Sequence, residues 1–179
     1  MKQIFLLLLS LSLLGCPSHK DPVINDAGVD VTSDVLVCDD AAIETETVVT
    51  VDNWQVTLPI GWVEKKSESK DIVLQADNDK DQGMLALIKE PYERSFDAFS
   101  IETIRGLRGQ GAEIVILSSM LLNDKEFVYV KSKEQGFIVH TWLTVHDEFG
   151  YSLNCGGAED NFSELSEDCM AISSSFNIR

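Results

Sequence analysis

The second half of the chain contains three segments of strand-forming residues at hairpin spacing, and this pattern constrains the fold most. The segments are residues 112–122, 125–133 and 136–146. Asn123-Asp124 and Glu134-Gln135-Gly136 lie between them, and these residue types favour tight hairpin turns. Strands joined by such turns pair antiparallel. The sequence therefore predicts a mainly antiparallel sheet.

Further strands are predicted on both sides of these three. Apolar and polar residues alternate in Trp54-Gln55-Val56-Thr57-Leu58, as in a half-buried strand. Pro59-Ile60-Gly61 then predicts a turn, because proline fixes φ at the second position of a turn and glycine is tolerated at its end. The remaining predicted strands cover residues 43–51, 62–64, 71–76, 84–89 and 149–155.

Two helices are expected among these strands. Ser95 is a favourable N-cap and Asp97 suits a helix N-terminus, while Gly109 and Gly111 suit its C-terminus. The last helix is expected to begin at Asp160 or Asn161. Apolar residues recur at helical spacing in each helix, which predicts one buried face apiece. These residues are Phe96, Phe99, Ile104 and Leu107 in the first helix, and Phe162, Leu165, Cys169 and Ile172 in the second.

The order of these elements predicts the fold class. Hairpins dominate, and the chain shows no regular alternation of strand and crossover helix. We therefore expect an α+β domain with a mainly antiparallel sheet.

Residues 1–15 are predicted to be a signal peptide. A basic start, Met1-Lys2-Gln3, precedes an apolar run from Ile4 to Leu14, which is shorter than the roughly 20 residues needed to span a bilayer. A core helix is the alternative, but Pro17 would end a helix there. The run closes with Leu13-Leu14-Gly15-Cys16, which resembles the lipobox of bacterial lipoproteins.

The lipobox resemblance implies that Cys16 is acylated and anchors the mature chain in a membrane. Each buried methylene contributes about 0.8 kcal/mol, so two or three acyl chains give a lasting anchor. Pro17 stands where the family's inner-membrane retention signal has Asp, which favours the outer membrane. The expected location is the cell envelope, with the protein facing the periplasm or the cell surface. A plain signal peptide without lipidation is the alternative.

Residues 16–42 are predicted to form the lipidated Cys and a flexible acidic tether, and residues 43–179 the folded domain. The tether is rich in turn formers and lacks aromatic residues, so it cannot bury enough apolar surface to fold. Within it, residues 34–38 are either a short edge strand or coil. The whole chain has a formal net charge of -16. This charge argues against nucleic acid as a partner.

Two parts of the predicted domain resemble PsbP-like and DcrB-like domains. The segment from Trp54 to Trp62 is similar to the strand and Pro-x-Gly-Trp opening of that family. Tyr151-Ser152-Leu153, Phe162 and Ile172-Ser173-Ser174-Ser175-Phe176 are similar to its closing strand and helix. The resemblance implies an αβα sandwich, in which a twisted antiparallel sheet has helices on both faces. Members include a photosystem II accessory subunit, a binder of a nuclear-transport GTPase and envelope lipoproteins, so it implies macromolecular binding without fixing a function.

Three cysteines remain if Cys16 is lipidated. Cys155 ends a predicted strand and Cys169 lies within the last helix, and a bridge between them would close a loop of about 15 residues. Two reduced, buried cysteines are the alternative. Cys38 is then a free thiol, an intermolecular partner, or the true partner of one of the others. No CxxC motif or close Cys/His cluster indicates zinc.

His140, Trp142 and His146 share one face of a predicted strand, and this mixed face is a candidate binding surface. A strand face half covered by a helix is the alternative. The two histidines are separated by roughly 20 Å of strand, too far to share a metal ion. Residues 77–81 are acidic enough to suggest a cation loop, but a solvated hairpin tip is the preferred interpretation. No cofactor and no metal site are expected.

These observations lead to a functional hypothesis. The sequence contains no recognisable nucleophile with its base and no phosphate-binding loop, so we expect a protein that is not an enzyme. The expected function is binding or assembly with another envelope protein, through a domain held at the membrane by Cys16. The alternative is binding of a small molecule or a cation by the domain.

Overall fold

The structure is a computed structural model that describes residues 45–80 and 82–178. The predicted signal peptide, the lipobox with Cys16, and the tether with Cys38 lie outside the described residues. The described residues form one compact unit of strands with two α-helices.

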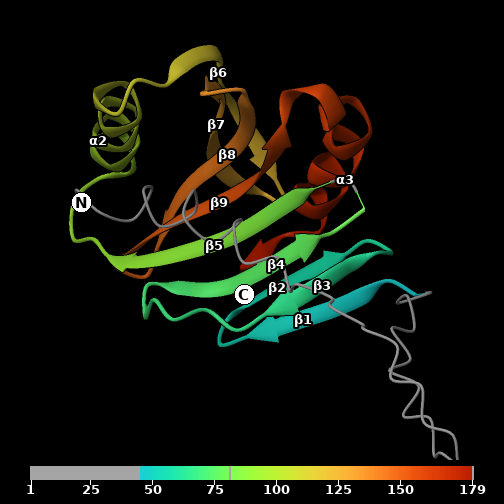
Figure 1. Ribbon diagram of the computed structural model, residues 1–179. Coiled ribbons are helices and arrows are strands. Elements are labelled where there is room, and N and C mark those ends of the chain that lie inside the picture. The colour runs from blue at the N-terminus through green and yellow to red at the C-terminus, as the bar shows by residue number, and fades with distance from the viewer. Residues whose placement is uncertain (1–44, 81, 179) are drawn as a thin grey trace, which may run out of the picture. The chain divides into compact units, whose positions relative to one another are not determined.

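A large antiparallel sheet forms the centre of the domain (Figure 1). Its strands, in spatial order, are β3 (Trp62–Lys65), β4 (Ile72–Asn78), β5 (Gly83–Pro91), β9 (Phe149–Ala158), β8 (Phe137–His146), β7 (Lys125–Glu134) and β6 (Glu113–Leu122). Every neighbouring pair is antiparallel. The three predicted hairpin strands became β6, β7 and β8, side by side at one end of the sheet.

The hairpin turns have the backbone geometry that antiparallel strands require. Asn123 and Asp124 both have positive φ, as do Gln135 and Gly136. Two successive residues of positive φ match the right-handed twist of the flanking strands. Both turns lie where the sequence predicts them.

A second, three-stranded sheet is a feature that the sequence analysis did not predict. It contains β1 (Thr47–Val51), β2 (Trp54–Leu58) and β10 (Asn177–Ile178), with β2 in the middle. The chain leaves this sheet at Pro59–Gly61, where Gly61 has φ of 91°, and enters the large sheet at Trp62. One continuous sheet was expected. The two-residue β10 is too short to give a recognisable pattern.

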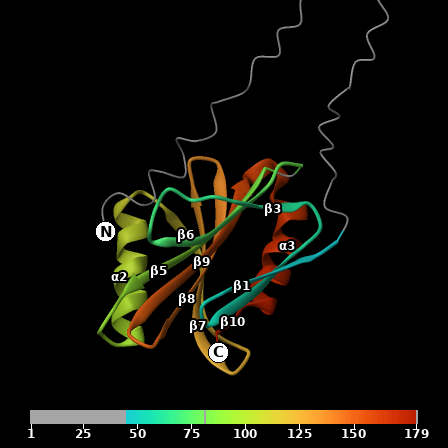
Figure 2. The same ribbon diagram turned by 90° about the horizontal axis from the view of Figure 1, so that it is seen from below.

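The helices cover opposite faces of the large sheet (Figure 2). Helix α2 (Phe96–Gly109) begins at Ser95, whose side chain accepts a hydrogen bond from the backbone amide of Ala98. Its Phe99 packs over Gly150 of β9. A short 3-10 turn, η1 (Glu159–Asn161), leads into α3 (Phe162–Ser175), which lies on the other face together with the small sheet.

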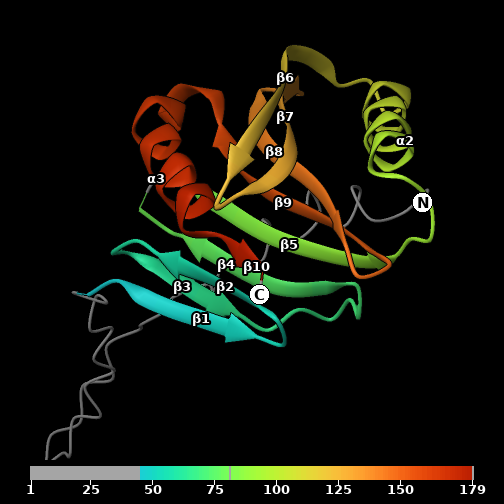
Figure 3. The ribbon, with the colours of Figure 1, turned by 180° about the vertical axis from the view of Figure 1, so that it is seen from behind.

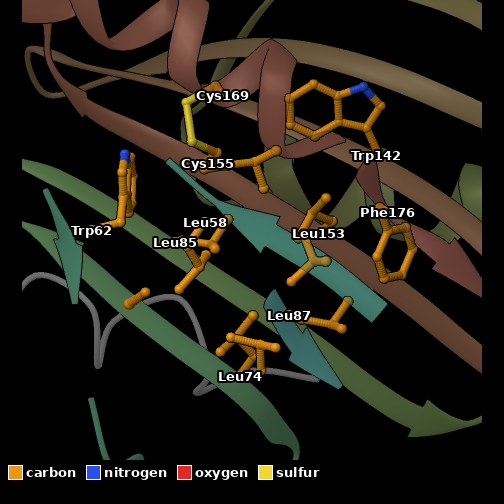
Figure 4. Close-up of a cluster of buried hydrophobic side chains, with 14 of the residues drawn as sticks. Leu58, Trp62, Leu74, Leu85, Leu87, Trp142, Leu153, Cys155, Cys169 and Phe176 are labelled. Carbon is orange, nitrogen blue, oxygen red and sulfur yellow. A yellow bond between two sulfur atoms is a disulfide. The ribbon is translucent and has the colours of Figure 1, made fainter. Parts of the chain in front are cut away.

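The main hydrophobic core lies between the large sheet, α3 and the small sheet (Figure 4). Trp54, Trp62 and Trp142 are all fully buried there. The predicted apolar face of α3 enters this core, and Leu165 fits between Gly83 and Gly157, where an added Cβ would lie within 2.6 Å of its methyl carbons. The α+β fold predicted from the sequence is therefore confirmed.

Candidate interaction surface

Strand β6 forms one edge of the large sheet and is the most exposed apolar segment of the described domain. Figure 3 shows it at the opposite end of the sheet from β3. Leu117 is 51% exposed and Leu121 is 73% exposed. Val115 and Ile116 are exposed as well. Solvent therefore reaches apolar side chains along most of the strand.

The exposure follows from where the covering elements lie. Helix α2 packs chiefly on β8, and α3 packs chiefly on β9 and β2. Most of β6 lies beyond both helices, but Met120 and Leu122 pack partly against the main core, and the side chain of Asn123 after them donates to backbone carbonyls at the C-terminal end of α3. Within the described residues, β6 pairs only with β7, so its outer edge presents backbone amides and carbonyls without strand partners.

The two edges of the large sheet are built differently. Soluble proteins usually protect a sheet edge by making it short, charged or bulged. Strand β3 follows this rule, because it has four residues, ends in Glu64 and Lys65, and is followed by Lys66. Strand β6 has ten residues, and no charged residue, proline or glycine lies between Ile114 and Leu122. Its only protection is a bulge between Ile114 and Ile116.

Past this bulge, residues 116–122 pair regularly with β7. The side chains of one face are exposed, whereas on the other face Met120 and Leu122 are half-buried and pack against the main core. One face holds Leu117, Ser119 and Leu121, and the other holds Ile116, Ser118, Met120 and Leu122, because side chains alternate along a strand. An extended segment that paired with this edge would gain backbone hydrogen bonds and apolar contacts together.

The sequence predicts β6 as a strand but does not by itself indicate a binding site there. A continuous apolar run commonly indicates a strand buried on both faces. One sequence feature does point to an exposed apolar edge. The nine residues 114–122 carry no charge and form the first strand of the hairpin series, and the first strand of such a series lies at the edge of its sheet unless a later segment pairs with it.

The candidate binding face on β8 proves to be part of the interior. Trp142 is 1% exposed and His140 is 3% exposed. The His140 ring lies 4.9 Å from the Phe162 ring of α3, measured between centroids. His146 is half-buried at the end of the strand, where its Nε2 lies 3.3 Å from a carboxylate oxygen of Asp147. Because α3 covers this face, the three side chains do not form a joint surface for a ligand.

His140 has an environment that disfavours its charged form. Burial, assisted by the nearby positive charge of Lys131, lowers the pKa of His140 to about 4. Its Nδ1 lies 3.4 Å from the hydroxyl oxygen of Tyr129, and its Nε2 is buried without a hydrogen-bond partner. The imidazole is therefore neutral near pH 7 and serves the packing beneath α3.

Cys155 and Cys169 are bonded in the structure. Their Cα atoms are 5.5 Å apart, and the bridge joins β9 to α3 inside the core (Figure 4). Both residues are completely buried. This is the pairing that the sequence analysis favoured.

The remaining candidate ligand sites are weakly developed in the described part of the chain. No group of three or more His, Cys, Asp or Glu side chains is placed to hold a metal ion among the described residues. In the acidic loop, burial raises the pKa of Asp77, and residue 81 lies outside the described residues. A surface depression of about 390 Å³ is lined by Tyr92, Glu93, Arg94, Val145 and Glu148.

Two of the polar side chains that line that depression, Tyr92 and Arg94, already have partners within the protein. The hydroxyl of Tyr92 donates to a carboxylate oxygen of Glu102 at 3.1 Å, and Arg94 forms an ion pair with the same carboxylate. Ligand pockets usually combine apolar walls with a few available polar groups. Val145 is the one aliphatic side chain among the described residues that line this depression, so it lacks the apolar walls of a usual pocket and adds little to the small-molecule hypothesis.

No helix in the described residues is long and apolar enough to cross a membrane. The predicted anchor at Cys16 lies outside those residues.

Comparison with known proteins supports the fold. No protein-family model matches the chain, and no curated protein matches it. Cyanobacterial PsbP (CyanoP) from Synechocystis sp. PCC 6803 is similar with a TM-score of 0.61 and 12% identity, over 79% of this chain and 97% of that one. At this identity the likeness shows the fold alone. The domain therefore has the PsbP-like fold that its sequence predicts.

Two further solved structures share this fold. LpqN of Mycobacterium tuberculosis, which is involved in cell envelope biogenesis, has a TM-score of 0.51 and 14% identity, over 75% of this chain and 90% of that one. The Ran-binding protein Mog1p of Saccharomyces cerevisiae has a TM-score of 0.52 and 10% identity, over 75% of this chain and 95% of that one. Their different roles illustrate that this fold does not determine a function.

Proposed function

We propose that this protein is a lipid-anchored module of a bacterial cell envelope that binds a protein partner and is not an enzyme. The exposed edge of β6 is the observation that carries the proposal. The partner contributes an extended segment that pairs with this edge. The lipobox resemblance at Cys16 and the fold shared with an envelope protein support the location in the cell envelope. The fold shared with a Ran-binding protein supports the binding of a protein partner.

The chemistry of β6 explains how such a partner is held. Backbone groups at the outer edge supply hydrogen bonds that do not depend on the partner's side chains. Specificity and most of the affinity then come from burying Leu117 and Leu121. Fully burying a leucine side chain contributes about 1.5–3 kcal/mol. Because Leu117 and Leu121 are 51% and 73% exposed, burying the rest of both contributes about 2–4 kcal/mol, which changes an equilibrium constant by roughly one and a half to three orders of magnitude.

Affinity purification of the full chain from the membranes of the cells that produce it tests the proposal. Leu121→Lys places a charge on the edge at a side chain that is 73% exposed, so the fold of the domain tolerates it. The matched control is Ile101→Lys on α2, where the side chain is 55% exposed. With a tagged and an untagged copy of each chain produced together, we expect the unmodified chain and the control to retain a stoichiometric partner, either another protein or the untagged copy, and Leu121→Lys to lose it. Equal retention by both variants would refute binding at β6.

The anchor is tested separately. Replacing Cys16 with Ala removes the thiol that the lipobox resemblance assigns to acylation. We expect the variant to leave the membrane fraction, whereas Cys38→Ser stays with it. A Cys16→Ala chain that still sediments fully with membranes would contradict the lipid anchor. It would not bear on partner binding at β6, which the Leu121→Lys variant tests.

A further inference from the structure

We propose that the partner at β6 is β6 of a second copy of this chain, paired antiparallel about a two-fold axis that passes between the two Ser119 residues. The inference rests on the proposed function, because it names the segment that the exposed edge binds. Such pairing joins the two large sheets into one continuous sheet. The interface is isologous, so each copy contributes the same surface.

The position of the axis follows from the bulge. Regular pairing with β7 covers residues 116–122, and the bulge between Ile114 and Ile116 bends the strand before that segment. Two copies overlap fully over the regular segment only when its central residue, Ser119, faces its own counterpart. In this register Leu117 faces Leu121 of the other copy, and Ile116 faces Leu122.

This register matches the side chains on both faces of the sheet. A two-fold axis perpendicular to the sheet leaves the corresponding faces of the two copies on the same side of the joined sheet. Even-numbered residues of one copy therefore lie opposite even-numbered residues of the other, and odd-numbered residues lie opposite odd-numbered ones. On one face, the exposed Leu117 and Leu121 of one copy cover those of the other. On the second face, Ser118 lies opposite Met120, so that a small side chain meets a long one. Each exposed apolar side chain of the regular segment thus gains an apolar or small neighbour.

Charge favours a second copy at this edge over a partner of opposite charge. The chain is strongly acidic, with a net charge of -16, so most pairings of two copies would bring like charges together. Like charges directly opposite each other on paired strands are destabilising. Strand β6 has no charge from Ile114 to Leu122, whereas its neighbour β7 carries charged residues at both ends. An uncharged edge also gives an oppositely charged protein no complementary charge to recognise.

Cysteine cross-linking of the full chain in its membranes tests the register, in a Cys38→Ser background that removes the unassigned thiol. In the proposed pair, the two Ser119 Cβ atoms are about 4.5–5.5 Å apart, close to the spacing that a disulfide needs. The two Ser118 residues are diagonal neighbours, whose Cβ atoms are somewhat less than about 7–8 Å apart, still beyond the roughly 4.5 Å that a disulfide allows. Both serines are exposed, so the two variants are matched.

On mild oxidation with copper phenanthroline, we expect Ser119→Cys to convert mostly to a covalent dimer and Ser118→Cys to remain monomeric. Adding Leu121→Lys to Ser119→Cys should reduce the dimer at least tenfold, whereas adding Ile101→Lys should not. A monomeric Ser119→Cys, or equal cross-linking of the two cysteine variants, would overturn the self-pairing. If the cross-link fails while a different protein co-purifies through Leu121, the partner is that protein and the proposed function stands. Failure of both the cross-link and the co-purification removes both proposals.

Discussion

The disulfide between Cys155 and Cys169 gives the sharpest test of how the domain is stabilised. The two residues are 14 positions apart, so the bridge closes a loop of about 15 residues, and restricting such a loop in the unfolded chain stabilises the folded state by about 3 kcal/mol. Globular domains have total stabilities of about 5–15 kcal/mol. The double variant Cys155→Ala, Cys169→Ala should therefore lose a large part of its stability.

Urea unfolding followed by tryptophan fluorescence provides the assay, because Trp54, Trp62 and Trp142 are buried in the same core. For a slope of about 2 kcal/mol per molar urea, a loss of 3 kcal/mol moves the midpoint by roughly 1.5 M. The oxidised chain treated with a reductant should shift nearly as far, and Cys38→Ser should not shift. A double variant within about 0.5 kcal/mol of the parent would refute the reasoning. So would alkylation of both Cys155 and Cys169 in the unfolded, non-reduced protein.

Three further predictions concern single residues. His140 has a folded-state pKa of about 4 against about 6.5 when unfolded, so the unfolded state binds its proton first as the pH falls. As the pH falls from 6.5 to 4, the free energy of unfolding of the parent should decrease relative to that of His140→Gln, by at most about 1.4 kcal/mol per pH unit. Urea unfolding at each pH measures both, and an equal dependence on pH in the two proteins would contradict the prediction. Gly150→Ala puts a Cβ 2.4–2.9 Å from ring atoms of Phe99 and should lower the free energy of unfolding in urea by about 1–3 kcal/mol. Gly106→Ala, where the added Cβ meets open space, should not lower it. Equal losses in the two variants would count against the packing argument. Glu148 has φ of 64°, a left-handed conformation that is unfavourable for a residue with a Cβ. Glu148→Gly should therefore stabilise the domain by about 1 kcal/mol and raise its melting temperature. A lower melting temperature would contradict the prediction.

Local patterns predict most of the large sheet because its strands are joined by hairpins. Asn123-Asp124 and Gln135-Gly136 specify turns through their own backbone preferences, so the strands beside them are recognisable without tertiary information. The small sheet is different. Strand β10 has only two residues, and its partner β2 lies at the other end of the domain sequence. Such a pairing leaves no periodic pattern to detect.

The candidate site was harder to predict, because residue type alone does not indicate what covers a strand. His140 and Thr144 make one face of β8 look partly polar, yet α3 and the small sheet bury it. Thr144 satisfies its hydroxyl on the backbone carbonyl of Glu126, which allows a polar side chain inside. The apolar β6 suggests an interior strand, but its position at the end of the sheet exposes it. Burial depends on strand order, which the sequence does not state.

The pairing of β2 with both β1 and β10 has a consequence for how the protein is made. A backbone amide at Thr57 is hydrogen-bonded to Ser175 Oγ, 118 positions later in the chain, and Phe176 and Ile178 complete the core beside Trp54. Contacts between such distant segments slow folding, because the loop between them must close first. The core cannot be completed until residues 175–178 have been synthesised. A chain stopped short of residue 176 would therefore present its buried tryptophans to the proteases and chaperones of the compartment in which it folds.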